Sequence, residues 1–398
     1  MKKFRLIVIA YFAISTFNCN SQTWTVSWEK EYGSPGKSYF SDIVEDRNGG
    51  FTVLGAIESD DTKSDALWLV RLNSSGDTLW DHEYDAPVIL MPEALVQSSD
   101  NGYLMVGSTR TKNNTNQAML IKTSRDGAEL WRKNIGDSAS CLANAVVPLD
   151  DGSFVLTGAK STEQGHDNLW IIKIDPQGNT VWQKILGGKD IALGKSIKHL
   201  PDGGFAVAGV INAIGKRGSD FWLLRTNQDG ETIWQSRIRT PVARAWPESI
   251  CCSTDSCLVV VGWYGTSLNG IDAENPVFDY DIAVRKLDRN GKVLWTKNID
   301  SEGSEGGYNI TVRPDGTYLI AGEKETSFAG NIGPWLLHLD ANGKVLSENL
   351  IKFHFNHDQA YKIINCSDGG FAVIGPGEKA DANYRGFGWV IKFNPVSF

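Results

Sequence analysis

The chain has 398 residues, of which 41% are hydrophobic and 22% are charged, and its formal net charge is −8. These values exclude a disordered chain, a collagen-like chain and a multi-span membrane protein. An acidic chain without a Lys/Arg cluster also lacks the positive charge that binding to nucleic acid or to an anionic membrane requires. The 41 glycines and 14 tryptophans indicate many tight turns between aromatic packing units, a composition typical of all-β proteins.

The first element in chain order is an export signal. Three basic residues precede the apolar run 6–17, which is too short to span a bilayer. Two kinds of processing fit this segment: peptidase cleavage after Ser21, or lipidation of Cys19 as in a bacterial lipoprotein. We therefore expect a signal peptide at 1–21 and a single domain at 22–398. The mature protein is expected to be secreted or to lie in the periplasm or at the outer membrane, with no further transmembrane segment.

A repeat of about 51 residues determines the predicted fold. Its main mark is a glycine followed four residues later by a tryptophan, and the tryptophans are 51, 51, 52 and 61 residues apart. The pairs are Gly76/Trp80, Gly127/Trp131, Gly178/Trp182, Gly230/Trp234 and Gly291/Trp295, with Gly343/Ser347 as a degenerate sixth. A second mark is a glycine-rich turn before an aromatic residue. Together with 255–258, which fills the one missing place, these turns mark seven units.

Each unit is interpreted as four short strands, which in the first unit fall at 41–45, 51–55, 67–72 and 78–83. Runs such as 68–72 are apolar at nearly every position, which indicates strands buried on both faces by neighbouring sheets. The 3.6-residue periodicity of a helical repeat is absent. Four strands per unit, stacked sheet on sheet, predict an all-β protein with a seven-bladed β-propeller.

The two ends of the chain are expected to complete one blade together. The last unit supplies its third strand at 389–393, and the chain then stops before the strand that carries Gly-x-x-x-Trp. The segment 24–32 is a strand without a unit, and Trp28 within it has the sequence context of Trp80. The N-terminal strand therefore completes the seventh blade in this interpretation, which closes the propeller and removes a free sheet edge.

The repeats resemble those of secreted or lipoprotein-type bacterial β-propellers, which carry Asp-Gly-Gly-Phe-x-Val-x-Gly and Trp-Leu-x-Lys-Leu-Asp-x-x-Gly-x-x-x-Trp. Asp175, Gly178 and Trp182 carry this resemblance, as does 288–295. The same motif is similar to the tryptophan-docking motif of quinoprotein-like and outer-membrane-assembly propellers. The resemblance implies the fold, and it implies little about function because one scaffold hosts many unrelated sites.

The cysteines are considered in the context of export. Cys252 and Cys257 flank a four-residue turn in the fifth unit, which has lost its glycine pair, and a disulfide between them would staple that turn. The pairing of Cys141, Cys251 and Cys366 stays open, although an odd number of cysteines after residue 21 leaves at least one thiol unpaired. No Cys/His spacing indicates zinc and no Asp-rich calcium loop occurs, so no metal and no cofactor is expected.

The fifth unit also carries the candidate binding residues. Connections from the fourth strand to the next first strand share one end of a propeller with those from the second strand to the third. The longest connection there is 262–281, and insertions on one face of a repeat array are often the binding face. The candidate ligand-binding residues are Trp246, Trp263, Tyr264, Arg239 and Arg244. An aromatic platform with a polar rim suits carbohydrate rings, while the alternative that Trp246 and Trp263 only pack the long loop stays open.

A catalytic alternative rests on three residues in loops of the last unit. His357, Tyr384 and Arg385 supply the residue types that β-elimination beside a uronate carboxylate needs, as base, acid and carboxylate clamp respectively. This trio resembles the catalytic groups of polysaccharide lyases on propeller scaffolds, and the resemblance implies such an enzyme as an alternative.

Three functions are therefore compared. We favour an exported, non-catalytic propeller that binds a glycan or a protein partner at its loop-rich face, because repeats cover the chain and no compact catalytic motif occurs. A polysaccharide lyase is the first alternative. An envelope-assembly scaffold, anchored by a lipid at Cys19, is the second.

Overall fold

The structure is a computed structural model in which most of the chain after residue 23 can be described. The described residues are 24–33, 37–47, 49–58, 65–85, 90–110, 115–136, 139–163, 165–212, 218–239, 243–268, 278–301, 303–326, 331–351, 358–378 and 386–395. They form seven four-stranded antiparallel sheets and contain no helix. In particular, this part of the chain holds no helix with the length and apolarity to cross a membrane.

The sheets follow one another along the chain, and each is called a blade. Blade 1 is β2 (Lys37–Glu45), β3 (Phe51–Glu58), β4 (Ala66–Leu72) and β5 (Thr78–Asp85); blade 2 is β6 (Leu90–Gln97), β7 (Tyr103–Arg110), β8 (Asn116–Thr123) and β9 (Glu129–Ile135). Blade 3 is β10 (Cys141–Pro148), β11 (Phe154–Ser161), β12 (Asp167–Ile174) and β13 (Thr180–Leu186); blade 4 is β14 (Ile191–His199), β15 (Phe205–Asn212), β16 (Asp220–Thr226) and β17 (Thr232–Ile238). Blade 5 is β18 (Ala243–Cys252), β19 (Leu258–Ser267), β20 (Phe278–Leu287) and β21 (Val293–Ile299); blade 6 is β22 (Glu305–Val312), β23 (Tyr318–Thr326), β24 (Asn331–Leu339) and β25 (Val345–Leu350). Blade 7 is β26 (Lys362–Asn365), β27 (Phe371–Glu378), β28 (Gly386–Phe393) and β1 (Val26–Tyr32).

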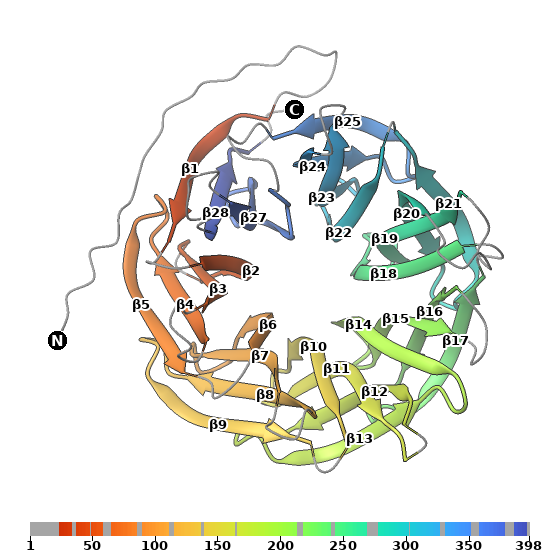
Figure 1. The fold of residues 1–398 in the computed structure, drawn as a ribbon, viewed down its shortest axis with the longest axis horizontal. Helices are drawn as coiled ribbons and strands as arrows, with labels where there is room; N and C mark the ends of the chain where they lie inside the picture. Colours follow the sequence, from red (N-terminus) through yellow and green to blue (C-terminus); the bar gives the residue numbers. More distant parts are fainter. Residues whose placement is uncertain are drawn as a thin grey trace.

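The blades stand around a central axis with their first strands innermost and their last strands outermost (Figure 1). The middle strands are buried at nearly every position, as in β7 and β12, because both of their faces pack against neighbouring blades. Outer strands such as β13 alternate between exposed and half-buried residues. The prediction of an all-β seven-bladed propeller is confirmed.

The N-terminal strand closes the ring as expected. β1 pairs with β28 in antiparallel register, with Val26 opposite Phe393 and Tyr32 opposite Gly388. Blade 7 therefore takes its outer strand from the start of the chain and its other three strands from the end (Figure 1). Pairing of the two chain ends holds the ring shut through backbone hydrogen bonds.

The repeated glycine and tryptophan join each blade to the next. Trp131, on the outer strand of blade 2, lies against Gly178 in the last turn of blade 3, and its indole N–H donates to the Pro176 carbonyl at 3.1 Å. Gly178 has a φ of +76°, and a Cβ there would lie 2.8 Å from the Trp131 ring, so only glycine fits. The same contact joins Trp28/Gly76, Trp80/Gly127, Trp182/Gly230, Trp234/Gly291 and Trp295/Gly343.

Trp24 fills the one place where this series is broken. Blade 6 has Ser347 in place of the outer-strand tryptophan, and blade 7 has no glycine turn after β28 to receive one. The Trp24 ring instead packs edge-on against Phe371 of blade 7, with 5.3 Å between ring centroids. Trp28 and Phe51 make the equivalent contact between blades 7 and 1 at 5.9 Å. Trp24 therefore replaces the missing side chain from the other end of the chain.

The predicted Cys252–Cys257 disulfide is not formed, because both side chains are free thiols in the structure. The residue opposite Cys252 in the hairpin is Leu258, while Cys257 lies inside the turn, where its carbonyl accepts a 2.9 Å hydrogen bond from the Ser253 N–H. The two cysteines are thus one position out of cross-strand register. Cys251 and Cys366 are also free thiols, and both are buried, as is Cys141.

Candidate functional site

A β-bulge in the innermost strand of the blades places polar side chains in the central channel. In β18, for example, the register shifts between Pro247 and Ser249, so Glu248 is an extra residue without a cross-strand partner. Five other first strands shift at the same place, and Tyr361 has the corresponding position in blade 7. We call these residues the bulge ring: Ser41, Glu93, Asn144, Lys195, Glu248, Tyr308 and Tyr361.

All seven residues of the bulge ring line one cavity along the propeller axis, with a volume of about 570 Å³. The bulge residues have no cross-strand partner in the sheet ladder, so the ladder does not fix their identity. Some of them contact the next blade, as when Asn144 donates to the Gly194 carbonyl at 2.7 Å. They are all polar or phenolic, and the seven positions hold five residue types. Variation inside an otherwise regular repeat is the pattern expected of a binding surface.

Charged members of the bulge ring interact across the cavity. Lys195 Nζ lies 3.2 Å from Glu248 Oε2, and both side chains are half-buried. Burial disfavours the charged Lys195, but the carboxylates of Glu248 and Glu93 outweigh it and raise the pKa of Lys195. Burial raises the pKa of Glu93 to about 7 against the opposing effect of Lys195, and Glu248 adds to the rise. Glu93 is therefore a carboxyl group poised near neutral pH.

The predicted tryptophan pair lies beside these charges. Trp246 and Trp263 are opposite each other in β18 and β19, and their half-buried rings stack with centroids 5.8 Å apart and an angle of 6°. The Trp263 indole N–H donates to Glu248 Oε1 at 3.2 Å. Lys195 Nζ lies 5.6 Å from the Trp246 ring centroid. The tryptophans thus form an aromatic wall that contacts the bulge ring through Glu248 and Lys195.

Two aromatic residues that the sequence analysis did not select extend this wall. Tyr280 stands perpendicular to Trp263 with centroids 5.2 Å apart, and Phe278 stacks on Tyr280 at 5.9 Å. The predicted residue Arg244 covers Phe278 at 4.6 Å. We call Trp246, Trp263, Tyr280 and Phe278 the aromatic row. Alternation of aromatic residues at 278 and 280 was a strand signal that could have identified them.

The predicted 262–281 loop is partly strand. β19 continues to Ser267 and β20 begins at Phe278, and the two pair over that whole length. Aromatic and β-branched residues in both segments favour the pleated strand over a loop. Blade 5 therefore projects a longer hairpin than its neighbours at the end of the propeller where second strands connect to third strands, which we call the loop-rich end.

The other predicted site residues lie elsewhere or outside the described residues. Tyr264 points to the opposite side of β19 from the aromatic row and packs against a buried cluster that includes Phe221 and Ala245. Arg239 is exposed just after the outer strand of blade 4. His357, Tyr384 and Arg385, the proposed catalytic trio, fall outside the part of the chain that the structure describes.

Residues of blades 6 and 7 form the facing part of the channel wall. Tyr308 and Tyr361 contact each other edge to face, with ring centroids 5.3 Å apart. The Gln359 side-chain amide donates to the Tyr308 hydroxyl at 3.4 Å and also to the Glu323 carboxylate. Burial, and then Glu323 and Glu248, raise the pKa of Tyr361 to about 12, so it is a neutral hydrogen-bonding group at physiological pH.

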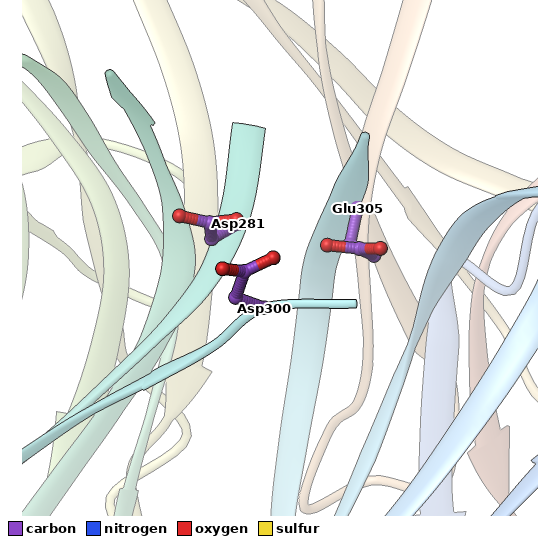
Figure 2. Close-up of side chains that lie close together, drawn as sticks. All are labelled: Asp281, Asp300 and Glu305. Atoms are coloured by element: carbon purple, nitrogen blue, oxygen red, sulfur yellow. The ribbon is translucent and has the colours of Figure 1, made fainter. Parts of the chain in front are cut away.

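A separate group of carboxylates lies at the loop-rich end of blades 5 and 6. Figure 2 shows Asp281 on β20, Asp300 just after β21 and Glu305 at the start of β22. One carboxylate oxygen from each lies within 4.8 Å of the other two, and oxygen ligands of this kind suit hard divalent cations. Burial, with Asp300 and Asp279, raises the pKa of Asp281 to about 6, and burial raises that of Glu305 to about 7. The sequence analysis missed the group because three strands contribute one residue each.

Comparisons with known proteins extend the description of the fold. No protein-family model matches the chain. The regulatory protein FlaEY of Caulobacter vibrioides is 23% identical over 256 residues, which are 57% of this chain and only 26% of FlaEY. The polysaccharide lyase Uly1 has a similar structure, with a TM-score of 0.57, 10% identity and 92% and 91% of the two chains covered.

A second similar structure is the WD40 domain of Pan2 from Neurospora crassa. Its TM-score is 0.55, with 13% identity over 96% of this chain and 98% of that domain. At these identities the likeness extends to the propeller scaffold, which hosts unrelated functions. Function must therefore be argued from the site.

Proposed function

We propose that this protein is an exported, non-catalytic propeller that binds a saccharide at the loop-rich mouth of its central channel. The observation that carries the proposal is the half-buried Trp246–Trp263 stack joined to the Lys195–Glu248 ion pair on the wall of an open cavity. A sugar ring presents an apolar C–H face and a polar edge. The indole faces match the first, and the charged and amide groups beside them match the second.

The first test is a glycan array followed by calorimetry on the mature protein. Trp246→Ala and Trp263→Ala should each weaken binding by about tenfold or more, because each removes half of the stack. Arg244→Ala should weaken binding less, and Arg239→Ala, the matched control away from the aromatic row, should leave it unchanged. Thermal melting of every variant separates loss of ligand from loss of fold.

Two results would overturn parts of this proposal. Release of unsaturated sugars, abolished by His357→Ala, would replace the non-catalytic proposal with a polysaccharide lyase. Binding to no saccharide would leave a protein partner as the ligand, as in an assembly scaffold.

Export is tested separately by identifying the N-terminal residue of the mature protein, since cleavage after Ser21 exposes Gln22 and lipidation leaves a modified Cys19.

A further inference from the structure

The charges at the channel mouth indicate which saccharide the site takes. The cavity wall at the loop-rich side carries two carboxyl groups, from Glu93 and Glu248, and one ammonium group, from Lys195. Lys195 is already paired with Glu248 and lies against Trp246. This part of the cavity wall therefore keeps an excess of one acidic group, since the Arg244 guanidinium lies on Phe278 of the aromatic row and does not line the cavity.

Glu93 holds the unmatched charge. Among the described residues Lys195 forms its ion pair with Glu248, and Glu93 has no ion pair. Its neighbours in the bulge ring, Ser41 and Asn144, are neutral. The carboxyl group faces the cavity, where a ligand can reach it. Lys195 acts on Glu93 without forming an ion pair with it, and a carboxylate in this position in a narrow, low-dielectric channel attracts a further cation.

Charges deeper in the channel are arranged differently. Lys362 Nζ forms a 2.9 Å ion pair with Asp42 Oδ1, and the other Asp42 oxygen accepts the Leu95 N–H at 2.8 Å. Lys198 also lines the cavity from blade 4. The excess of acid is therefore confined to the loop-rich side, where the aromatic row lies.

We propose that the saccharide bound here carries a free amine, whose ammonium group is received by Glu93 while the sugar ring stacks on Trp246 and Trp263. This inference rests on the proposed saccharide-binding function and narrows it to amino sugars. A uronate would instead bring its own carboxylate beside Glu93 and Glu248, and binding would then cost free energy through desolvation and repulsion.

The experiment compares three hexasaccharides by calorimetry: β-1,4-linked glucosamine, its fully N-acetylated counterpart, and galacturonate. At about pH 5.5 both the ligand amine and Glu93 are largely protonated. An ammonium group bound beside Glu93 drives its carboxyl group to ionise, so binding releases up to about one proton per site. Titration in buffers of different ionisation enthalpy measures that release, and the N-acetylated sugar should release none.

Substitution of Glu93 tests the residue itself. Glu93→Gln should abolish proton release and weaken glucosamine binding about tenfold while leaving the N-acetylated sugar unaffected. Glu129→Gln, on the exposed outer strand of the same blade, is the matched control. Thermal melting checks the fold, and proton release by the unaltered protein tests the inference without any variant.

The outcomes separate the two proposals. One contrary result is that the N-acetylated sugar or galacturonate binds as tightly as glucosamine or more tightly, without proton release. That result would overturn the proposal that the ligand carries a free amine, and it would leave the proposed saccharide binding intact. If none of the three hexasaccharides binds and no glycan on the array binds, both the proposed saccharide binding and the proposed free amine are overturned.

Discussion

At the scale of single residues, basic side chains on third strands hold the first hairpin of their own blade. Lys122 Nζ lies 2.7 Å from Asp100 Oδ2, and Lys286 Nζ lies 2.7 Å from Asp255 Oδ2. Each lysine is buried, so its charge depends on the aspartate in the turn. His338 takes the same place in blade 6 and contacts the Thr317 hydroxyl at 2.9 Å, and burial lowers its pKa, which favours the neutral ring.

The substitution Asp100→Asn tests this contact. It should lower the free energy of unfolding by about 1–2 kcal/mol, because Lys122 stays buried without its counter-charge. Burial opposes the ionised Asp100, yet hydrogen bonds from Lys122 and Ser98 outweigh it and hold its pKa below the ordinary value. The wild-type advantage is therefore full above the ordinary aspartate pKa and disappears as the pH falls toward the folded-state value.

Urea denaturation at neutral and acid pH measures this difference. Asp229→Asn, in an exposed turn, is the control and should change stability little. A loss of stability that is equal at both pH values would contradict the electrostatic explanation.

At the scale of elements, blades 5 and 6 meet at the Asp281, Asp300 and Glu305 carboxylates. These groups come from β20, the end of β21 and β22, so their mutual repulsion acts across the blade interface. The folded state holds a proton on Asp281 up to about pH 6, whereas the unfolded chain releases it near the ordinary value. The contribution of this group to stability is therefore present at low pH and is lost as the pH rises through about 6.

The variant Asp281→Asn should consequently be more stable than the wild type at about pH 8 and nearly equal to it at about pH 4.5. Chemical denaturation at the two pH values provides the measurement. Asp279→Asn removes a charge two residues away that contributes least to the raised pKa of Asp281, so it should give a smaller gain and serves as the comparison. If Asp281→Asn instead gained more stability over the wild type at acid pH than at about pH 8, the folded state would not raise the pKa of Asp281.

At the scale of the whole molecule, closure depends on residues at both chain ends. β1 supplies the outer strand of blade 7, and Trp24 supplies the aromatic contact that Ser347 does not make. The last backbone contact of this seam is the Asn394 N–H to the Thr25 carbonyl, at 2.9 Å. Because each blade touches only its neighbours, one weak junction lowers the cooperativity of the entire ring.

Replacement of Trp24 measures how much the seam contributes. Trp24→Ala should lower the free energy of unfolding by about 3 kcal/mol, since it removes a large ring packed on Phe371 and Phe393. Leu130→Ala, at an outer-strand side chain that is 57% exposed, is the control. Equal melting temperatures for the two variants would mean that Trp24 does not stabilise the seam.

The sequence by itself determined the architecture because the same sequence pattern recurs in successive blades. Glycine, tryptophan and turn residues recur at fixed spacing, so the blade count, the strand order and the closing strand could all be read without coordinates. Trp246 and Trp263 were identified by their place in the fifth unit, which has the longest connection in the repeat array. They stack because they fall opposite each other in one hairpin.

Only the tertiary structure decided the rest of the site. Glu93, Lys195 and Glu248 come from three blades, and a one-residue bulge in each first strand turns them into the channel. A bulge changes which face a side chain takes, so local alternation cannot foretell it. The disulfide prediction failed because Cys252 lies opposite Leu258, one position away from Cys257. Sequence spacing determines the repeat, and cross-strand register determines which side chains meet.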